Sequence, residues 1–213
     1  MASLAAADRR TTIERLPRLM IGLILCGVGI ALMVDADLGL APWDVLHQGV
    51  NQRTGIAMGT VGILVGVVVL LVWVPLKERF GVGTVLNVIT IGVTIDVALP
   101  LLPDHPALGL RWAFLVTGAL LLGPAGGLYI GVGLGAGPRD GLMTALAARG
   151  WSVRVVRTSM ELAVLLIGWA LGGSVGIGTV LFAVTIGPNV HFWLERLTLP
   201  GVLPPAEGVI EVE

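Results

Sequence analysis

Charge is scarce in this sequence. Only 13% of its 213 residues are Asp, Glu, Lys or Arg, whereas 55% are hydrophobic and the mean hydropathy is +0.94. A soluble domain usually carries about twice that share of charged residues. The thirteen basic and fourteen acidic residues nearly cancel, so no overall field attracts nucleic acid, and we expect no nucleic-acid partner.

Signatures of catalysis and of metal binding are missing as well. The single cysteine, Cys26, can form neither an internal disulfide nor a thiolate metal cluster. There are only three histidines, and no His-Glu-x-x-His, Gly-x-Ser-x-Gly or P-loop pattern occurs. We therefore expect no catalytic residue, no metal, no cofactor and no enzymatic activity.

Long uncharged stretches, by contrast, dominate the chain. No charged residue occurs in five runs, at 19–34, 54–76, 80–95, 112–138 and 162–194. Such lengths match the ~20 apolar residues that a helix needs to cross a bilayer. The last run is too long for one helix and is broken by glycines near its middle, so it predicts two. The sequence thus predicts an all-α polytopic membrane protein with six spans, over 18–34, 57–75, 82–99, 111–132, 154–171 and 176–195.

The distribution of Lys and Arg predicts the orientation. With six spans, eleven of the thirteen basic residues fall on the side of the N-terminus, and only Arg53 and Arg111 fall on the other. Cytoplasmic loops retain positive charge, so both termini are expected in the cytoplasm. The chain then divides into an N-terminal tail (1–17), a membrane repeat (18–99), an external linker (100–110), a second membrane repeat (111–196) and a C-terminal tail (197–213).

The two membrane repeats are visible in the sequence itself. Leu-Gly-Leu-Ala-Pro-Trp-Asp at 38–44 returns as Leu-Gly-Ala-Gly-Pro-Arg-Asp at 134–140, and Gly-Val-Gly-Thr-Val-Leu at 81–86 returns as Gly-Ile-Gly-Thr-Val-Leu at 176–181. Collinear matches at nearly one spacing indicate a duplicated unit. Each unit holds three spans, an odd number, so the second unit is expected to be inverted relative to the first.

A short segment follows each Leu-Gly motif. As helices, segments 42–53 and 138–149 would rise only ~18 Å, little more than half of the ~30 Å hydrocarbon core. Each is therefore expected to be either a re-entrant helix or a helix that lies at the membrane interface.

Both short segments begin with proline and carry an aspartate two residues later. One interpretation is a pair of well-capped helices, because proline suits the first position and an early carboxylate complements the helix dipole. The other is a substrate pathway, because broken helices in inverted repeats build transporter sites. On the second interpretation, the pathway candidates are Asp44, Asp140, Gly39, Pro42, Gly135, Gly137, Pro138 and Arg139.

Four further polar residues are secondary candidates. Arg157 and Glu161 lie four residues apart, so they are expected to pair, either as a structural ion pair at the membrane edge or in an anion-binding or gating role. Asp96 and His191 occupy matching positions of the repeats and suggest a proton relay. Inversion would place them on opposite sides of the membrane, which favours two interfacial residues instead.

The motif set resembles the bacterial YczE/YitT-type integral membrane proteins. The resemblance is carried by residues 39–44, 135–143 and 156–161 and by two Gly-x-Gly-Thr runs, and it covers about residues 18–196. It implies a protein of the bacterial inner membrane, of a kind described as a membrane or transport protein. It also implies five spans, against the six of the charge-free runs.

Two functions follow as expectations. The favoured one is a small secondary transporter or permease, because inverted repeats with broken segments suit alternating access around a site at the bilayer midplane. The alternative is a membrane scaffold or regulator that assists another enzyme or assembly. A large hydrated cavity that reaches Asp44 and Asp140 would favour transport, and a dry interior packed by glycine would favour the scaffold. The expected partners are the lipid bilayer and a small molecule or ion, and a homo-oligomer stays open.

Overall fold

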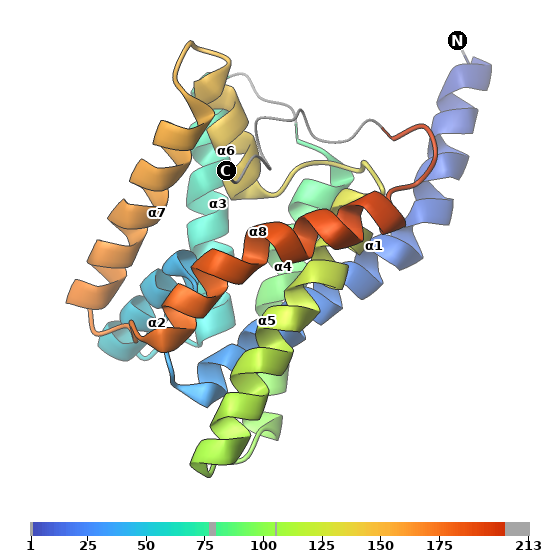
Figure 1. Cartoon of the computed structure of the whole chain (residues 1–213). Helices are drawn as coiled ribbons and strands as arrows, with labels where there is room; N and C mark the ends of the chain where they lie inside the picture. The colour runs from blue at the N-terminus through green and yellow to red at the C-terminus, as the bar shows by residue number, and fades with distance from the viewer. Residues whose placement is uncertain (1, 77–79, 105, 203–213) are drawn as a thin grey trace.

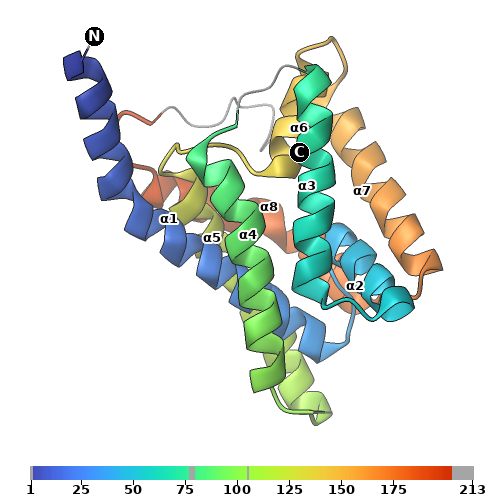
Figure 2. The same ribbon diagram turned by 180° about the vertical axis from the view of Figure 1, so that it is seen from behind.

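The computed structural model describes residues 2–76, 80–104 and 106–202, and this part of the chain is helical without any strand. Figures 1 and 2 show the helices from two sides. Their bounds are α1 Ala2–Ala36, α2 Pro42–Thr54, α3 Met58–Leu76, α4 Val82–Ala98, η1 Leu99–Leu101, α5 Leu108–Ile130, α6 Pro138–Ala147, α7 Val153–Ala170 and α8 Ile177–Leu197. The basic loop at 77–79, His105 of the linker and most of the C-terminal tail, 203–213, lie outside the described residues.

Five of the described helices are long and apolar enough to cross a membrane. They are 15–36 within α1, together with α3, α4 extended through η1, α5 and α8. The sixth predicted span forms a helix, α7, but it does not meet the same standard because Arg154, Arg157 and Glu161 lie in its first half. The chain is therefore an all-α, polytopic membrane protein. Five of its helices have the length and composition of membrane spans.

The helices form two groups. In one group α1 packs against α4 and α5, and α5 packs against α8; in the other α2 packs against α3 and α7, and α6 packs against the same two helices. The packing of α3 against α4 joins the two groups. Figures 1 and 2 agree that the short helices α2 and α6 lie at opposite ends of α3 and α7, with α6 at the end where the N-terminus lies. Both short segments are thus helices of the expected length, on different sides of the fold.

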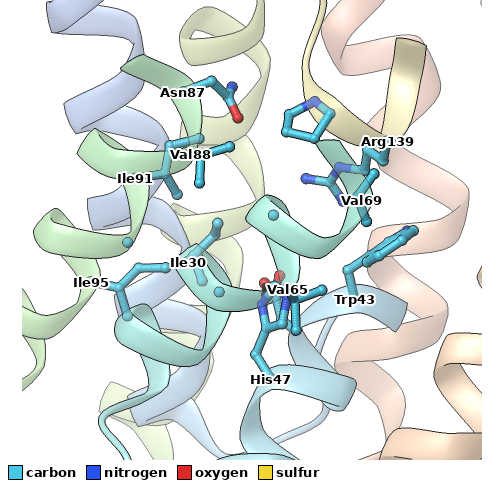
Figure 3. Close-up of a pocket in the computed structure, with 15 residues that line it drawn as sticks. Ile30, Trp43, His47, Val65, Val69, Asn87, Val88, Ile91, Ile95 and Arg139 are labelled. Atoms are coloured by element: carbon cyan, nitrogen blue, oxygen red, sulfur yellow. Dashed lines mark ion pairs between the residues drawn. The ribbon is translucent and has the colours of Figure 1, made fainter. Parts of the chain in front are cut away.

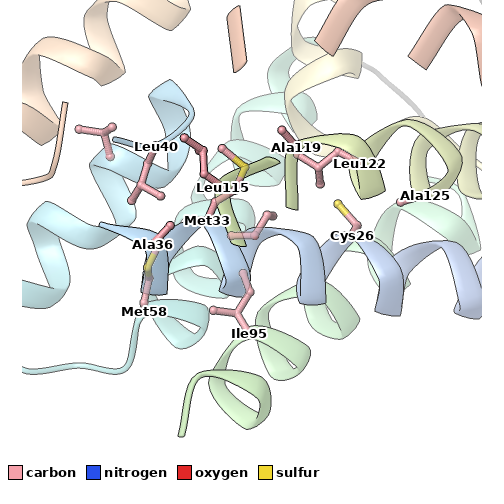
Figure 4. Packing of buried hydrophobic residues seen from close by; sticks show 12 residues of the cluster. Cys26, Met33, Ala36, Leu40, Met58, Ile95, Leu115, Ala119, Leu122 and Ala125 are labelled. Atoms are coloured by element: carbon pink, nitrogen blue, oxygen red, sulfur yellow. The ribbon is translucent and has the colours of Figure 1, made fainter. Parts of the chain in front are cut away.

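Helices α1 and α5 are antiparallel and form the centre of the core. Buried side chains from both helices, Cys26, Met33, Leu115 and Leu122 among them, pack together in Figure 4. Glycine allows the two backbones to approach closely, since a Cβ atom on Gly118 would lie 2.6 Å from the carbonyl oxygen of α1 beneath it. Close approach through small residues is how helices associate in lipid, where apolar surface gives no driving force.

Hydrogen bonds between the two halves come in matching pairs. Arg15 donates to the carbonyl of Val132 at 3.1 Å, and Arg111 donates to the carbonyl of Ala36 at 2.7 Å. The donors Arg15 and Arg111 lie 96 positions apart, and so do the acceptors Ala36 and Val132, in the reverse order. Likewise, the amide at position 83 donates to the carbonyl at 134, at 2.9 Å, and the amide at 178 donates to the carbonyl at 38, at 2.8 Å. Each Leu-Gly motif is therefore held by the Gly-x-Gly-Thr run of the other half.

Candidate functional site

A cavity of about 430 Å³ lies between the two helix groups. Cys26, Tyr129 and Phe182 line it from α1, α5 and α8, and residues of α2, α6 and α7 line the opposite wall. A smaller cavity of about 90 Å³ adjoins it between α2, α3 and α4. Both cavities share Ile30, Trp43, Asp44 and Arg139. The two halves of the chain therefore both contribute to these adjacent cavities, which together form the candidate site.

The starts of α2 and α6 face this site. Pro42 and Pro138 occupy the first turn of their helices, where the missing amide hydrogen costs nothing, and both line a cavity. The described residues include no backbone amide of either helix that donates to Asp44 or Asp140. The two carboxylates thus make no hydrogen bond to the amides of their own helices, although both lie in the first turn, where they complement the helix dipole. Both also line the large cavity.

The two aspartates have different neighbours. Asp44 is 7% exposed, and one of its oxygens lies 3.6 Å from Nδ1 of His47, one helical turn later. Asp140 accepts a hydrogen bond from the hydroxyl of Tyr129 at 3.2 Å. Position 143, the equivalent of His47 in the second repeat, is methionine. The site thus pairs one carboxylate with a group that can take up a proton and the other with a hydroxyl.

Two side chains that line the site carry hydrogen-bond donors, and they come from equivalent positions of the two motifs. Figure 3 shows Trp43 on α2 and Arg139 on α6 beside the smaller cavity. The indole nitrogen of Trp43 is buried and has no partner among the described residues, and Arg139 makes no hydrogen bond there either. Burial lowers the pKa of the Arg139 guanidinium, whereas Asp140 and Asp44 raise it, and the balance lies above its ordinary value. The negative charges of Asp44 and Asp140 therefore both favour the charged form of Arg139.

Arg157 and Glu161 form the expected pair, with Nε and Oε1 3.1 Å apart. Both side chains are about one third exposed and line the large cavity from α7. The pair faces the site rather than only the membrane edge. Its two charges cancel, so it adds polarity to the wall without adding net charge.

The glycines of the motifs divide between the cavity and the packing around it. Gly135 and Gly137 line the cavity, whereas Gly39 packs directly on Gly176. Gly39 and Gly135 both have positive φ angles, +107° and +133°, which favour glycine. Gly39 therefore lies outside the cavity lining and lets the chain turn and approach the other half.

Comparison with known proteins identifies the family to which the chain belongs. Residues 13–195 match the family of unknown function DUF6198. The chain belongs to this family. An uncharacterized protein of Haemophilus influenzae is 45% identical over 177 residues, which cover 83% of this chain and 81% of that protein. The uncharacterized membrane protein YczE of Bacillus subtilis is 35% identical over 179 residues, covering 82% and 83%. No solved structure gives a significant match.

The DUF6198 match confirms the YczE-type resemblance that the motifs predicted. It extends from α1 to α8 and includes every cavity residue named above. The name of YczE supports a membrane protein, and neither relative's name gives an activity.

Asp96 and His191 lie outside the two cavities of the DUF6198 fold. Asp96 accepts hydrogen bonds from the amide nitrogens of Gly59 and Thr60, at 2.6 and 2.8 Å, and from the Thr60 hydroxyl at 2.7 Å. His191 is exposed on α8 and lies 3.2 Å from Glu195. The structure joins neither residue to the other, so Asp96 serves as the cap of α3 and His191 as a surface residue.

We expect Asp96→Ala to lower the stability of the fold by about 1–3 kcal/mol, because the start of α3 loses its three bonds to a carboxylate. Thermal unfolding in detergent measures the loss. His191→Ala is the matched control and should stay within about 0.5 kcal/mol of the original protein, as exposed substitutions do. Equal stability of the two variants would contradict the capping role.

Tyr129 and Trp43 line the site but were not candidates from the sequence. Tyr129 lies inside a span and gave no signal. Trp43 and Arg139 occupy equivalent repeat positions, so the repeat alignment could have marked Trp43 as a second donor. Trp73 is only 2% exposed and donates its indole hydrogen to the carbonyl of Pro138 at 3.0 Å, which anchors the start of α6.

Proposed function

We propose that this protein is a small secondary transporter of the bacterial inner membrane. The observation that carries the proposal is the cavity of about 430 Å³ that contains Asp44, Asp140 and Arg139 between the two helix groups. Small-molecule sites have volumes of about 300–1,000 Å³ and combine apolar walls with a few polar groups. Charged groups within a membrane protein face such cavities and mark substrate pathways.

The proposal includes two inverted repeats with six crossings. The reciprocal hydrogen bonds of Arg15 and Arg111 support inversion, as does the antiparallel packing of α1 and α5. In this arrangement α7 is the sixth crossing, because it runs beside α3 from the α6 end of the molecule to the α2 end. Its charges are acceptable at membrane depth because two of them, on Arg157 and Glu161, face the cavity rather than lipid.

In an alternating-access transporter, the cavity opens toward one side of the membrane at a time, and this structure indicates which side. The lining of the large cavity reaches Val153 and Val202, near the α6 end. At the α2 end the halves are joined by polar contacts: Gln48 accepts from the amide of Ser174 at 2.6 Å, and the Ser174 hydroxyl donates to Asp37 at 3.0 Å. With the termini in the cytoplasm, the cavity of this state extends toward the inside.

The scaffold alternative predicted a dry interior packed by glycine. Glycine does pack α1 against α5, but a cavity of about 430 Å³ reaches both Asp44 and Asp140, which supports transport over a closely packed interior. We therefore retain transport as the proposed function, without an enzymatic reaction.

Cysteine accessibility tests alternating access without knowledge of the substrate. Thr144 is exposed and lines the cavity, whereas Gln48, its repeat equivalent, is buried at the α2 end. In a Cys26→Ser background we expect a membrane-impermeant maleimide to label Thr144→Cys from the inside and Gln48→Cys from the outside. The external label reports the state in which the α2 end opens.

Two control positions complete this experiment. Asp104→Cys in the external linker should react from outside at once, which establishes the orientation. Val61→Cys is 2% exposed in the α3 core and should stay unlabelled, which excludes labelling through unfolding. If Gln48→Cys reacts no faster than Val61→Cys, alternating access is rejected, and the membrane scaffold becomes the favoured function.

A further inference from the structure

We infer that the cavity binds a small zwitterion, an organic molecule that carries one carboxylate and one ammonium group on an apolar body. The carboxylate lies between Trp43 and Arg139, and the ammonium group lies against Asp140. This inference rests on the proposed function, because it names the substrate class of the same cavity.

The two donors require an acceptor. The indole nitrogen of Trp43 belongs to a side chain that is 8% exposed, and it has no hydrogen-bond partner among the described residues. Arg139 likewise donates no hydrogen bond there. A buried donor without a partner is costly. Both donors line the same two cavities, and a carboxylate can accept from an indole and a guanidinium at the same time.

The acidic groups require a cation. Among the charged residues that line the large cavity, Asp44, Asp140 and Glu161 outnumber Arg139 and Arg157 by one. Glu161 is paired with Arg157, which leaves two aspartates for Arg139. An ammonium group at Asp140 allows Arg139 to bind the carboxylate of the same ligand. The other aspartate, Asp44, lies 3.6 Å from Nδ1 of His47.

The rest of the wall fits an organic ligand rather than a metal ion. Trp43, Tyr129 and Phe182 present aromatic side chains to the cavity, and most of the other lining residues are apolar. Aromatic faces attract organic cations and pack against apolar bodies, whereas a metal cation needs a shell of oxygen ligands. The volume of about 430 Å³ accommodates an amino acid with a large side chain.

Three probes that share one phenyl body separate the charge classes. Phenylalanine carries both charges, phenethylamine only the ammonium group and 3-phenylpropionate only the carboxylate. Calorimetric titration of the full-length protein in nanodiscs should give phenylalanine the tightest binding. We expect each singly charged probe to bind at least about tenfold more weakly, a difference of ~1.4 kcal/mol.

Two variants then assign each charge to its residue. Arg139→Gln should bind phenylalanine and phenethylamine equally, because the carboxylate is no longer recognised. Asp140→Asn should bind phenylalanine and 3-phenylpropionate equally, because the ammonium group is no longer recognised. Asp140→Glu should restore the preference, which separates the charge from folding, and thermal unfolding confirms that each variant is intact.

The outcomes are decisive in both directions. Tightest binding of phenethylamine would establish a cation site, and tightest binding of 3-phenylpropionate an anion site; either overturns the zwitterion, as would the absence of binding by all three probes. None of these results affects the labelling of Gln48→Cys, so transport survives a wrong substrate class. Unchanged preferences in both variants would place the bound probe elsewhere and also reject the inference.

Discussion

Asp44→Asn and Asp140→Asn are each expected to abolish transport while folding and membrane insertion persist. Either change removes a carboxylate that acts on Arg139 and leaves that cation poorly compensated in a cavity with mostly apolar walls. We expect each variant to lose more than about tenfold in uptake, a difference of ~1.4 kcal/mol. Proteoliposomes under a proton or sodium gradient are offered a bacterial metabolite extract, and mass spectrometry identifies the trapped solutes.

Glu195→Gln is the control for these variants, because that carboxylate is 61% exposed on α8 and lies outside both cavities. It should accumulate the same solutes as the original protein. The capped-helix interpretation makes the opposite prediction for the site, since asparagine caps helices as well as aspartate does. Full uptake by both Asn variants would therefore remove Asp44 and Asp140 from the pathway.

Gly39→Ala and Gly135→Ala are expected to destabilise the fold by about 3 kcal/mol or more. An added Cβ on Gly39 would lie 2.5 Å from the backbone nitrogen of Gly176, and one on Gly135 would lie 2.6 Å from the Thr84 hydroxyl. The positive φ angles add a cost of ~1–2 kcal/mol for any L-residue. Both contacts join the two halves, so the same variants should also loosen the motif loops. Unfolding in mixed micelles measures the loss.

Two other glycines separate strain from close contact. Gly55 has a φ of +72° and open space around it, so Gly55→Ala should cost only about 1 kcal/mol. Gly109, at the start of α5, has neither a positive φ angle nor a close neighbour, and Gly109→Ala should leave stability unchanged or slightly raised. If Gly39→Ala lost no more stability than Gly55→Ala, the contact between the halves would contribute nothing.

The sequence alone predicted the helices and their lengths, because both depend on local properties of the chain. Charge-free runs have the length of a bilayer crossing, and glycine, proline and charge interrupt them, so the bounds of α3, α4, α5 and α8 lie within a few residues of the prediction. The starts of α2 and α6 were predicted at Pro42 and Pro138, where the structure has them. The repeat also indicated which positions are equivalent.

Only the tertiary structure decided where the polar side chains point. Asp44 and Asp140 could cap their own helices or face a cavity, and the choice depends on α1, α5 and α8, which are distant in sequence. Asp96 found its partners on another helix, α3. The physical reason is that helices such as α3 and α4 are apolar on all sides, so that hydrophobic periodicity does not reveal which face packs inward. Which donors meet which acceptors was fixed by the packing of whole helices, and no local pattern encodes that.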